Sequence, residues 1–110
     1  MQAAVKTPIE RVFLSLPEAE RETIIRHGVA LRLSDLRKRL FLAESKLRQF
    51  EERYGTALTH LDQAGLPDNA GYEMHEDYIV WHHSTTVVQK ARQEIAALQS
   101  IAQQGLWQGE

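Results

Sequence analysis

Large apolar residues recur along the first half of the chain at alternating spacings of four and three. The stripe consists of Val29, Leu33, Leu36, Leu40, Ala43, Leu47, Phe50, Tyr54, Ala57 and Leu61. A repeat that averages 3.5 residues indicates a helix that packs along its length against another helix. The pattern therefore predicts a long helix from about Pro17 to Tyr54 that needs a helical partner.

A second stripe with the same spacing follows from about Tyr72. Its members are Trp81, Ser84, Val88, Ala91, Ile95, Leu98 and Ala102. Residues 63–71 separate the two stripes and hold two glycines, a proline, an aspartate and an asparagine, which favour turns. The two stripes should face each other, so the sequence predicts an all-α fold, an antiparallel helical hairpin of the coiled-coil type.

Capping signals set the expected helix ends. Thr7-Pro8-Ile9-Glu10 has the pattern of a capping box with proline in the first turn, and predicts a short arm helix to about Leu14. Ser15-Leu16-Pro17-Glu18 repeats the signal and should start the long helix. Gly55 should end that helix in the left-handed conformation, and Thr56 should cap a short helix after it.

Gly28 leaves two alternatives open, because a glycine inside a helix costs about 1 kcal/mol relative to alanine. One helix could end there and another begin near Ser34. We favour a continuous helix, since Ile25, Val29 and Leu33 stay on one face across the glycine. The expected division is an arm at 1–16, one helical domain at 17–104 with its loop at 63–71, and a frayed tail at 105–110.

The composition narrows the class of protein. The chain has 110 residues, 43% of them hydrophobic, and no cysteine. No apolar run approaches the roughly 20 residues of a membrane-spanning helix, and residues 1–6 do not begin a secretory signal. We expect a soluble, cytoplasmic protein with no membrane association, no disulfide and no thiolate site.

The net charge of −2 gives no global attraction to nucleic acid, which we do not expect as a partner. Charge is uneven along the chain, since residues 32–53 are mildly basic and every charged residue in 62–77 is acidic. Arg37-Lys38-Arg39 lies between Leu36 and Leu40 of the stripe, so its side chains should point to the outer surface.

Further apolar residues lie beside the two stripes, and a single hairpin cannot cover them. They are Leu31, Phe41, Leu42, Val80, Val87 and Ile101. A second copy could cover them in a homodimeric four-helix bundle, and so could a different protein. The residues expected to form the packed interface are Val29, Leu33, Leu36, Leu40, Leu47, Phe50, Tyr54, Trp81, Val88, Ile95 and Leu98.

Residues 75–83 hold three of the five histidines and are the one candidate for chemistry. His75 and His82 lie seven residues apart, roughly 10 Å along a helix, too far to chelate one ion directly. The His pair at i, i+4 of zinc helices and the Glu-x-x-His of di-iron bundles are both missing. Metal ligation by His75, Glu76, His82 and His83 would need ligands from two subunits. We expect no catalytic residue and no cofactor.

One segment resembles a known group of proteins. It contains Tyr54-Gly55-Thr56, the pair Leu58 and Leu61, Gly65-Leu66-Pro67-Asp68, and the run from Tyr72 to Trp81. Over roughly residues 29–100 the chain is similar to small, mostly uncharacterised prokaryotic helical proteins, some of which are encoded beside toxin genes and taken to be antitoxins. The resemblance implies a helical hairpin and a small toxin-like protein as a possible partner.

The expected function is thus a non-enzymatic protein–protein interaction module that binds itself and a partner through amphipathic helices. The alternative is a metal-binding helical bundle that uses the histidine cluster.

Overall fold

The computed structural model describes residues 7–103, and this part of the chain is all-α, as predicted, with no strand. The elements are α1 (Pro8–Ser15), α2 (Glu18–Tyr54), α3 (Leu58–Ala64) and α4 (Tyr72–Gln103). The frayed tail predicted at 105–110 lies outside the described residues. None of the described helices has a stretch that is long and apolar enough to cross a membrane.

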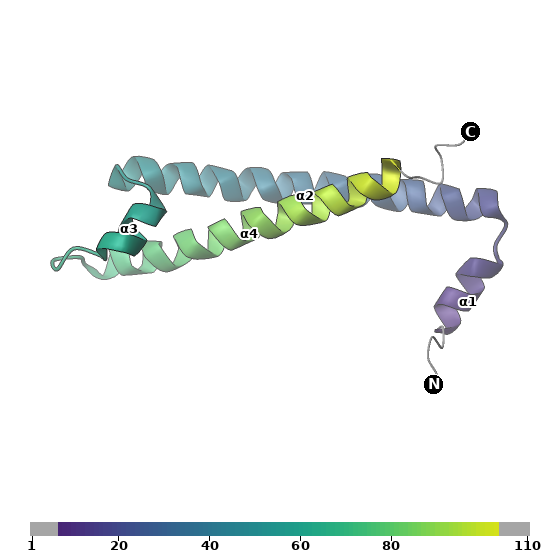
Figure 1. The fold of residues 1–110 in the computed structure, drawn as a ribbon, viewed down its shortest axis with the longest axis horizontal. Coiled ribbons are helices and arrows are strands. Elements are labelled where there is room, and N and C mark those ends of the chain that lie inside the picture. The colour runs from purple at the N-terminus through teal and green to yellow at the C-terminus, as the bar shows by residue number, and fades with distance from the viewer. Residues whose placement is uncertain (1–6, 104–110) are drawn as a thin grey trace.

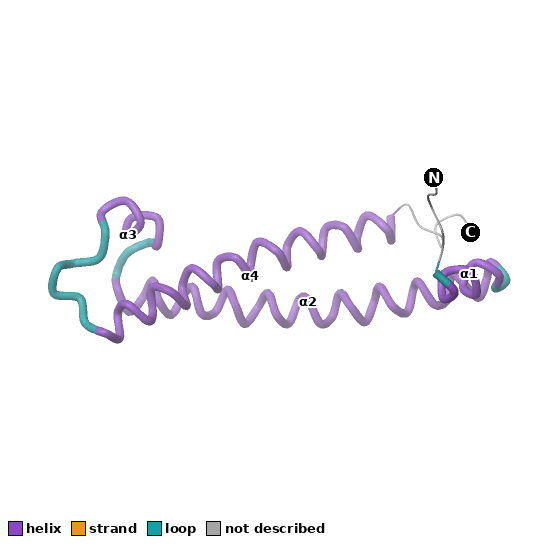
Figure 2. The backbone as a smooth tube through the Cα atoms, turned by 90° about the horizontal axis from the view of Figure 1, so that it is seen from below, coloured by secondary structure: helices purple, strands orange, loops and turns teal. Residues whose placement is uncertain are grey.

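The two long helices form one thin layer. Helices α2 and α4 lie side by side and run in opposite directions, and α3 sits across one end of them, next to the loop (Figure 1). In the view turned by 90°, α4 overlaps α2 near the loop and separates from it toward the other end, and α3 lies to one side of both (Figure 2). The molecule measures 64 × 37 × 19 Å, and its radius of gyration is 21.0 Å. A compact domain of this length has a radius of gyration of about 13 Å.

The core is a single line of side chains between α2 and α4. Helix α2 buries one residue in every seven, and α4 and α3 supply the opposing residues. The buried residues are Val29, Leu36, Ala43 and Phe50 from α2, Leu58 and Leu61 from α3, and Trp81, Ser84, Val88 and Ala91 from α4. Both predicted stripes supply this core.

Ala57 departs from the predicted stripe because it is exposed. The chain leaves the helical path at Gly55, whose φ of 64° is in the left-handed region that glycine favours. Ala57 is then the extended N-cap residue of α3. The 3.5-residue repeat therefore stops at Tyr54, and Leu61 is buried from a different helix.

The structure decides the alternatives at Gly28 in favour of continuity, since α2 runs through it without a break. The predicted capping box at the start of α1 is confirmed, because Thr7 Oγ1 accepts from Glu10 N–H and Glu10 Oε1 accepts from Thr7 N–H.

Two other predicted caps are wrong. Ser15 does not cap α2: its hydroxyl donates to Val12 O in the preceding helix, and α2 begins at Glu18 with Pro17 as its N-cap. Thr56 does not cap α3.

Candidate functional site

The end of the layer near the loop is its best-packed part. The ring of Trp81 stacks on Phe50 and Tyr54, at centroid distances of 5.4 and 6.0 Å. Leu58 and Leu61 of α3 complete this cluster. Aromatic pairs at these separations contribute about 0.5–1.5 kcal/mol beyond the area that they bury. The cluster fixes α3 against the two long helices.

Asp77 of α4 joins the two long helices beside this cluster. Its Oδ2 accepts hydrogen bonds from the Tyr54 hydroxyl at 2.5 Å and from Arg53 Nη1 at 2.6 Å. The Tyr54 hydrogen bond and, after it, the Arg53 guanidinium lower the pKa of Asp77. The same contact with Asp77 raises the pKa of Tyr54. Asp77 is thus held as a carboxylate between the last turn of α2 and the start of α4.

Asp62 makes the corresponding contact between α3 and α4. Its Oδ1 accepts from the Tyr78 hydroxyl at 2.6 Å and lies 2.7 Å from His82 Nε2. The hydrogen bond from Tyr78, followed by that from His82, lowers the pKa of Asp62, and Asp62 in turn raises the pKa of Tyr78. Two carboxylates, each with a phenol and a nitrogen donor, therefore connect three helices. Through these hydrogen bonds, both acids hold neighbouring helices together.

The four candidate metal ligands are not brought together. His82 contacts Asp62, whereas His75 Nδ1 lies 2.9 Å from Gly71 O at the start of α4. His83 lines a depression of about 260 Å³ with Arg39 and Lys90, and Glu76 is exposed. In the part of the chain that the structure describes, no group of three or more His, Cys, Asp or Glu residues could hold a metal ion.

The residues expected at the packed interface line the contact between α2 and α4 of the same chain. Five are buried there, namely Val29, Leu36, Phe50, Trp81 and Val88. Six are half-buried, namely Leu33, Leu40, Leu47, Tyr54, Ile95 and Leu98. The buried five are enclosed within one copy. A surface for a partner therefore has to draw on residues other than these buried five.

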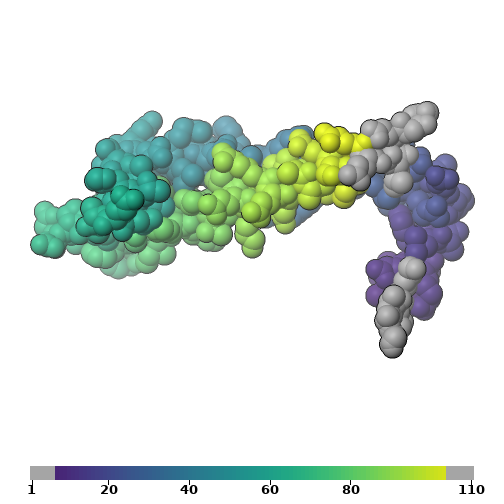
Figure 3. Space-filling view, in the orientation of Figure 1, coloured from purple at the N-terminus to yellow at the C-terminus, as the bar shows by residue number. Residues whose placement is uncertain are grey.

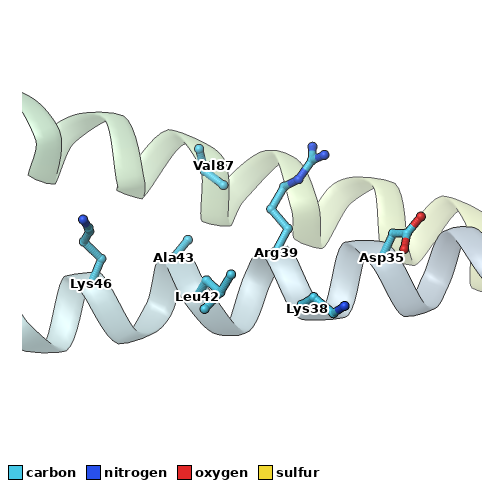
Figure 4. A pocket seen from close by; sticks show the side chains of 7 residues that line it. All are labelled: Asp35, Lys38, Arg39, Leu42, Ala43, Lys46 and Val87. Carbon is cyan, nitrogen blue, oxygen red and sulfur yellow. The ribbon is translucent and has the colours of Figure 1, made fainter.

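One face of the two-helix layer of α2 and α4 is open. A hollow of about 430 Å³ lies on it, lined by Asp35, Lys38, Arg39, Leu42, Ala43, Lys46 and Val87. Figure 4 shows that Val87 comes from α4 and the other six residues come from α2. Three of the lining residues are apolar, three are cationic and one, Asp35, is acidic. Such a surface suits a partner that presents apolar side chains together with charges of both signs.

Large apolar side chains are exposed along the whole layer. On α2, Leu31 is 67% exposed, and Phe41 and Leu42 are each 61% exposed. On α4, Ile79, Val80 and Ile101 are exposed. Helix α1 buries none of its residues, although Ile9, Val12 and Leu14 are large and apolar. Figure 3 shows α1 projecting from one end of the rod.

Reasoning from the sequence missed the two carboxylate contacts. It noted only that the charged residues of 62–77 are all acidic, whereas Asp62 and Asp77 bind side chains from other helices. Partners that lie 16 to 24 residues away leave no local signal. The one available hint was a tyrosine at the predicted helix end and another in the acidic start of the next helix. Tyrosine hydroxyls near a packed core usually find an acceptor.

Comparison of the chain with protein-family models, with curated proteins and with solved structures finds no match.

Proposed function

We propose that the protein is a non-enzymatic protein–protein interaction module that works as a homodimer. In this proposal two copies stack their layers of α2 and α4 into a four-helix bundle. Helix α1 stays free at the end of the bundle and is available to a further partner.

The observation that carries the proposal is the thinness of the core. A helix of 37 residues buries only four of them, while three large apolar side chains on its outer sides are more than half exposed. Full burial of a leucine or phenylalanine side chain contributes about 1.5–3 kcal/mol. A second layer against the open face would gain part of this free energy from the exposed residues on that face. A two-layer architecture is also the usual solution for helices that are apolar on one side.

An antitoxin-like role is a narrower form of this proposal. Its supports are the resemblance over residues 29–100 and the exposed apolar face of α1. A free amphipathic helix that docks in the groove of another protein is a common mode of recognition. If a toxin-like protein is encoded beside this gene, adding it should shift the NMR signals of Val12 and Phe13 in α1.

The test of the homodimer is the dependence of unfolding on protein concentration. Because association stabilises the folded state by mass action, the thermal midpoint of a dimer rises with concentration. We expect a rise across a hundredfold range of concentration, measured by circular dichroism at the helical band. An unchanged midpoint over that range would contradict the homodimer.

A further inference from the structure

The outer side of α2 carries a short stripe that its own chain does not cover. Its members Leu31, Asp35, Lys38 and Leu42 are spaced by four, three and four residues, which places them along one side of a helix. All four are exposed. Within residues 7–103 neither Asp35 nor Lys38 makes a hydrogen bond or ion pair through its side chain. The stripe thus presents two leucines at its ends and two opposite charges between them.

When two copies of this helix lie antiparallel, the stripe of one matches the stripe of the other: leucine faces leucine and each charge faces its opposite. If Leu31 lies opposite Leu42 of an antiparallel copy, then Asp35 lies opposite Lys38 of that copy, and both matches occur twice about the two-fold axis. An in-register parallel copy instead places Asp35 against Asp35 and Lys38 against Lys38. A shift of the antiparallel pair by seven residues in one direction sets Leu31 against Asp35, and in the other sets Lys38 against Leu42. One arrangement therefore matches all four positions.

We propose that α2 pairs antiparallel with α2 of a second copy through Leu31, Asp35, Lys38 and Leu42, with Asp35 opposite Lys38. The inference rests on the proposed homodimer and names its surface and register. An isologous contact of this kind is what two-fold symmetry requires, since each residue is used twice.

The open hollow beside the stripe supports this placement. Leu42 forms one wall of it, with Ala43 and Val87 behind. Leu31 of the second copy would meet Leu42 at this wall. Val87 also belongs to a line on α4, with Val80 and Ile101 at multiples of seven residues, so α4 can widen the same apolar surface. Charge thus selects the register while the apolar residues supply the buried area.

The experiment reverses the two charges separately and together. In Asp35→Lys, the new lysine meets Lys38 of the second copy, and in Lys38→Asp two aspartates meet. We expect each single variant to raise the dissociation constant of the dimer about tenfold at low ionic strength, because both copies of the pair change from attraction to repulsion. The double variant Asp35→Lys/Lys38→Asp should restore the wild-type constant. Dissociation constants are measured by sedimentation equilibrium.

Mixing the two single variants gives the sharper result. Every facing pair in the mixed dimer is again opposite in charge, so native mass spectrometry should show the mixed dimer in excess over both homodimers. This outcome also shows that neither variant is misfolded. The matched control is Arg37→Asp, which alters the charge of the adjacent residue, about 100° around the helix. It should leave the dissociation constant unchanged.

The outcomes separate the two proposals. If the wild type dimerises but the single variants bind as tightly as it does, or the double variant fails to recover, the stripe is not the interface and the homodimer stands. If the control variant weakens the dimer as much as Lys38→Asp does, the stripe is likewise not the interface. A wild type that stays monomeric throughout overturns the stripe and the homodimer together.

Discussion

Individual polar residues determine how the helices meet at the loop end of this protein. Tyr54 has two roles, since its ring stacks on Trp81 and its hydroxyl donates to Asp77. Asp62 receives the same kind of bond from Tyr78. A hydrogen bond to a charged group contributes more than one between neutral groups. Each of these hydrogen bonds requires one particular donor and one particular acceptor to meet. The apolar core, a single line of side chains, imposes no such pairing.

The hydroxyl of Tyr54 can be tested apart from its ring. Tyr54→Phe keeps the stacking on Trp81 and removes the bond to Asp77, so we expect a loss of about 1–2 kcal/mol in the free energy of unfolding. Urea unfolding measures the loss. The pKa of Asp77, followed by NMR, should rise toward its ordinary value because its main depressing contact is gone. Tyr72→Phe is the matched control, since Tyr72 is 80% exposed. Equal stability of Tyr54→Phe and this control would show that the bond contributes nothing.

Two aspartates and two tyrosines with shifted pKa values predict how stability depends on pH. Asp62 and Asp77 have lowered pKa values in the folded protein, so their contribution is complete above the ordinary value near 4 and is lost as the pH falls through the folded values. Tyr54 and Tyr78 have raised pKa values, so theirs is complete below about pH 10 and is lost as the pH rises further. Urea midpoints should form a plateau between these limits.

The variant Asp77→Asn tests whether Asp77 contributes to the loss of stability at low pH. The variant should be less stable at pH 7 and should show a weaker decline below pH 4 than the wild type. If the decline of stability below pH 4 is unchanged in this variant, groups other than Asp77 produce it.

Among the helices, the apolar repeat was the sequence feature that best predicted the structure. The 4-3 spacing located α2 and α4 and the residues that they bury, because a long helix must turn one face to its neighbour. Gly55 marked the end of α2 since its backbone adopts the left-handed conformation. The caps at Ser15 and Thr56 could not be predicted from residue type alone. A serine or threonine hydroxyl has local backbone acceptors as well, and Ser15 uses that of Val12.

The candidate site was less predictable than the fold. Helical periodicity says which residues share a face, but it does not say which acid on one helix meets which tyrosine on another. Asp62, Asp77 and their partners depend on how α3 crosses the end of the layer. The histidine cluster attracted attention because three histidines are close in sequence, yet His75, His82 and His83 contact different surroundings.

Two glycines in or beside α2 should respond oppositely to alanine. Gly28 is exposed inside the helix, and a Cβ there would meet nothing within 4 Å. Gly28→Ala should therefore raise the free energy of unfolding by about 1 kcal/mol. Gly55→Ala should lower it by a similar amount, since its φ of 64° strains an alanine. Urea unfolding of both variants makes the comparison. A loss of stability in Gly28→Ala would contradict this prediction and show that α2 requires glycine at position 28.

At the scale of the whole molecule, the protein is a rod one helix layer thick with apolar residues on its outer sides. The thinnest dimension of 19 Å leaves room for little more than one line of core residues. Ion pairs between the long helices, such as Arg92 with Glu44 and Arg32 with Glu94, lie at the surface and add little to stability. The shape and the exposed residues together favour a second layer, as the proposed homodimer requires.

Sedimentation velocity of the full chain over a wide range of concentrations can decide whether this second layer forms, because it reports mass and shape together. The proposed bundle predicts a species of twice the 12.6 kDa chain mass at micromolar concentration and above. It should also be less elongated than a single layer with a radius of gyration of 21.0 Å. A single 12.6 kDa species at every concentration would contradict the account.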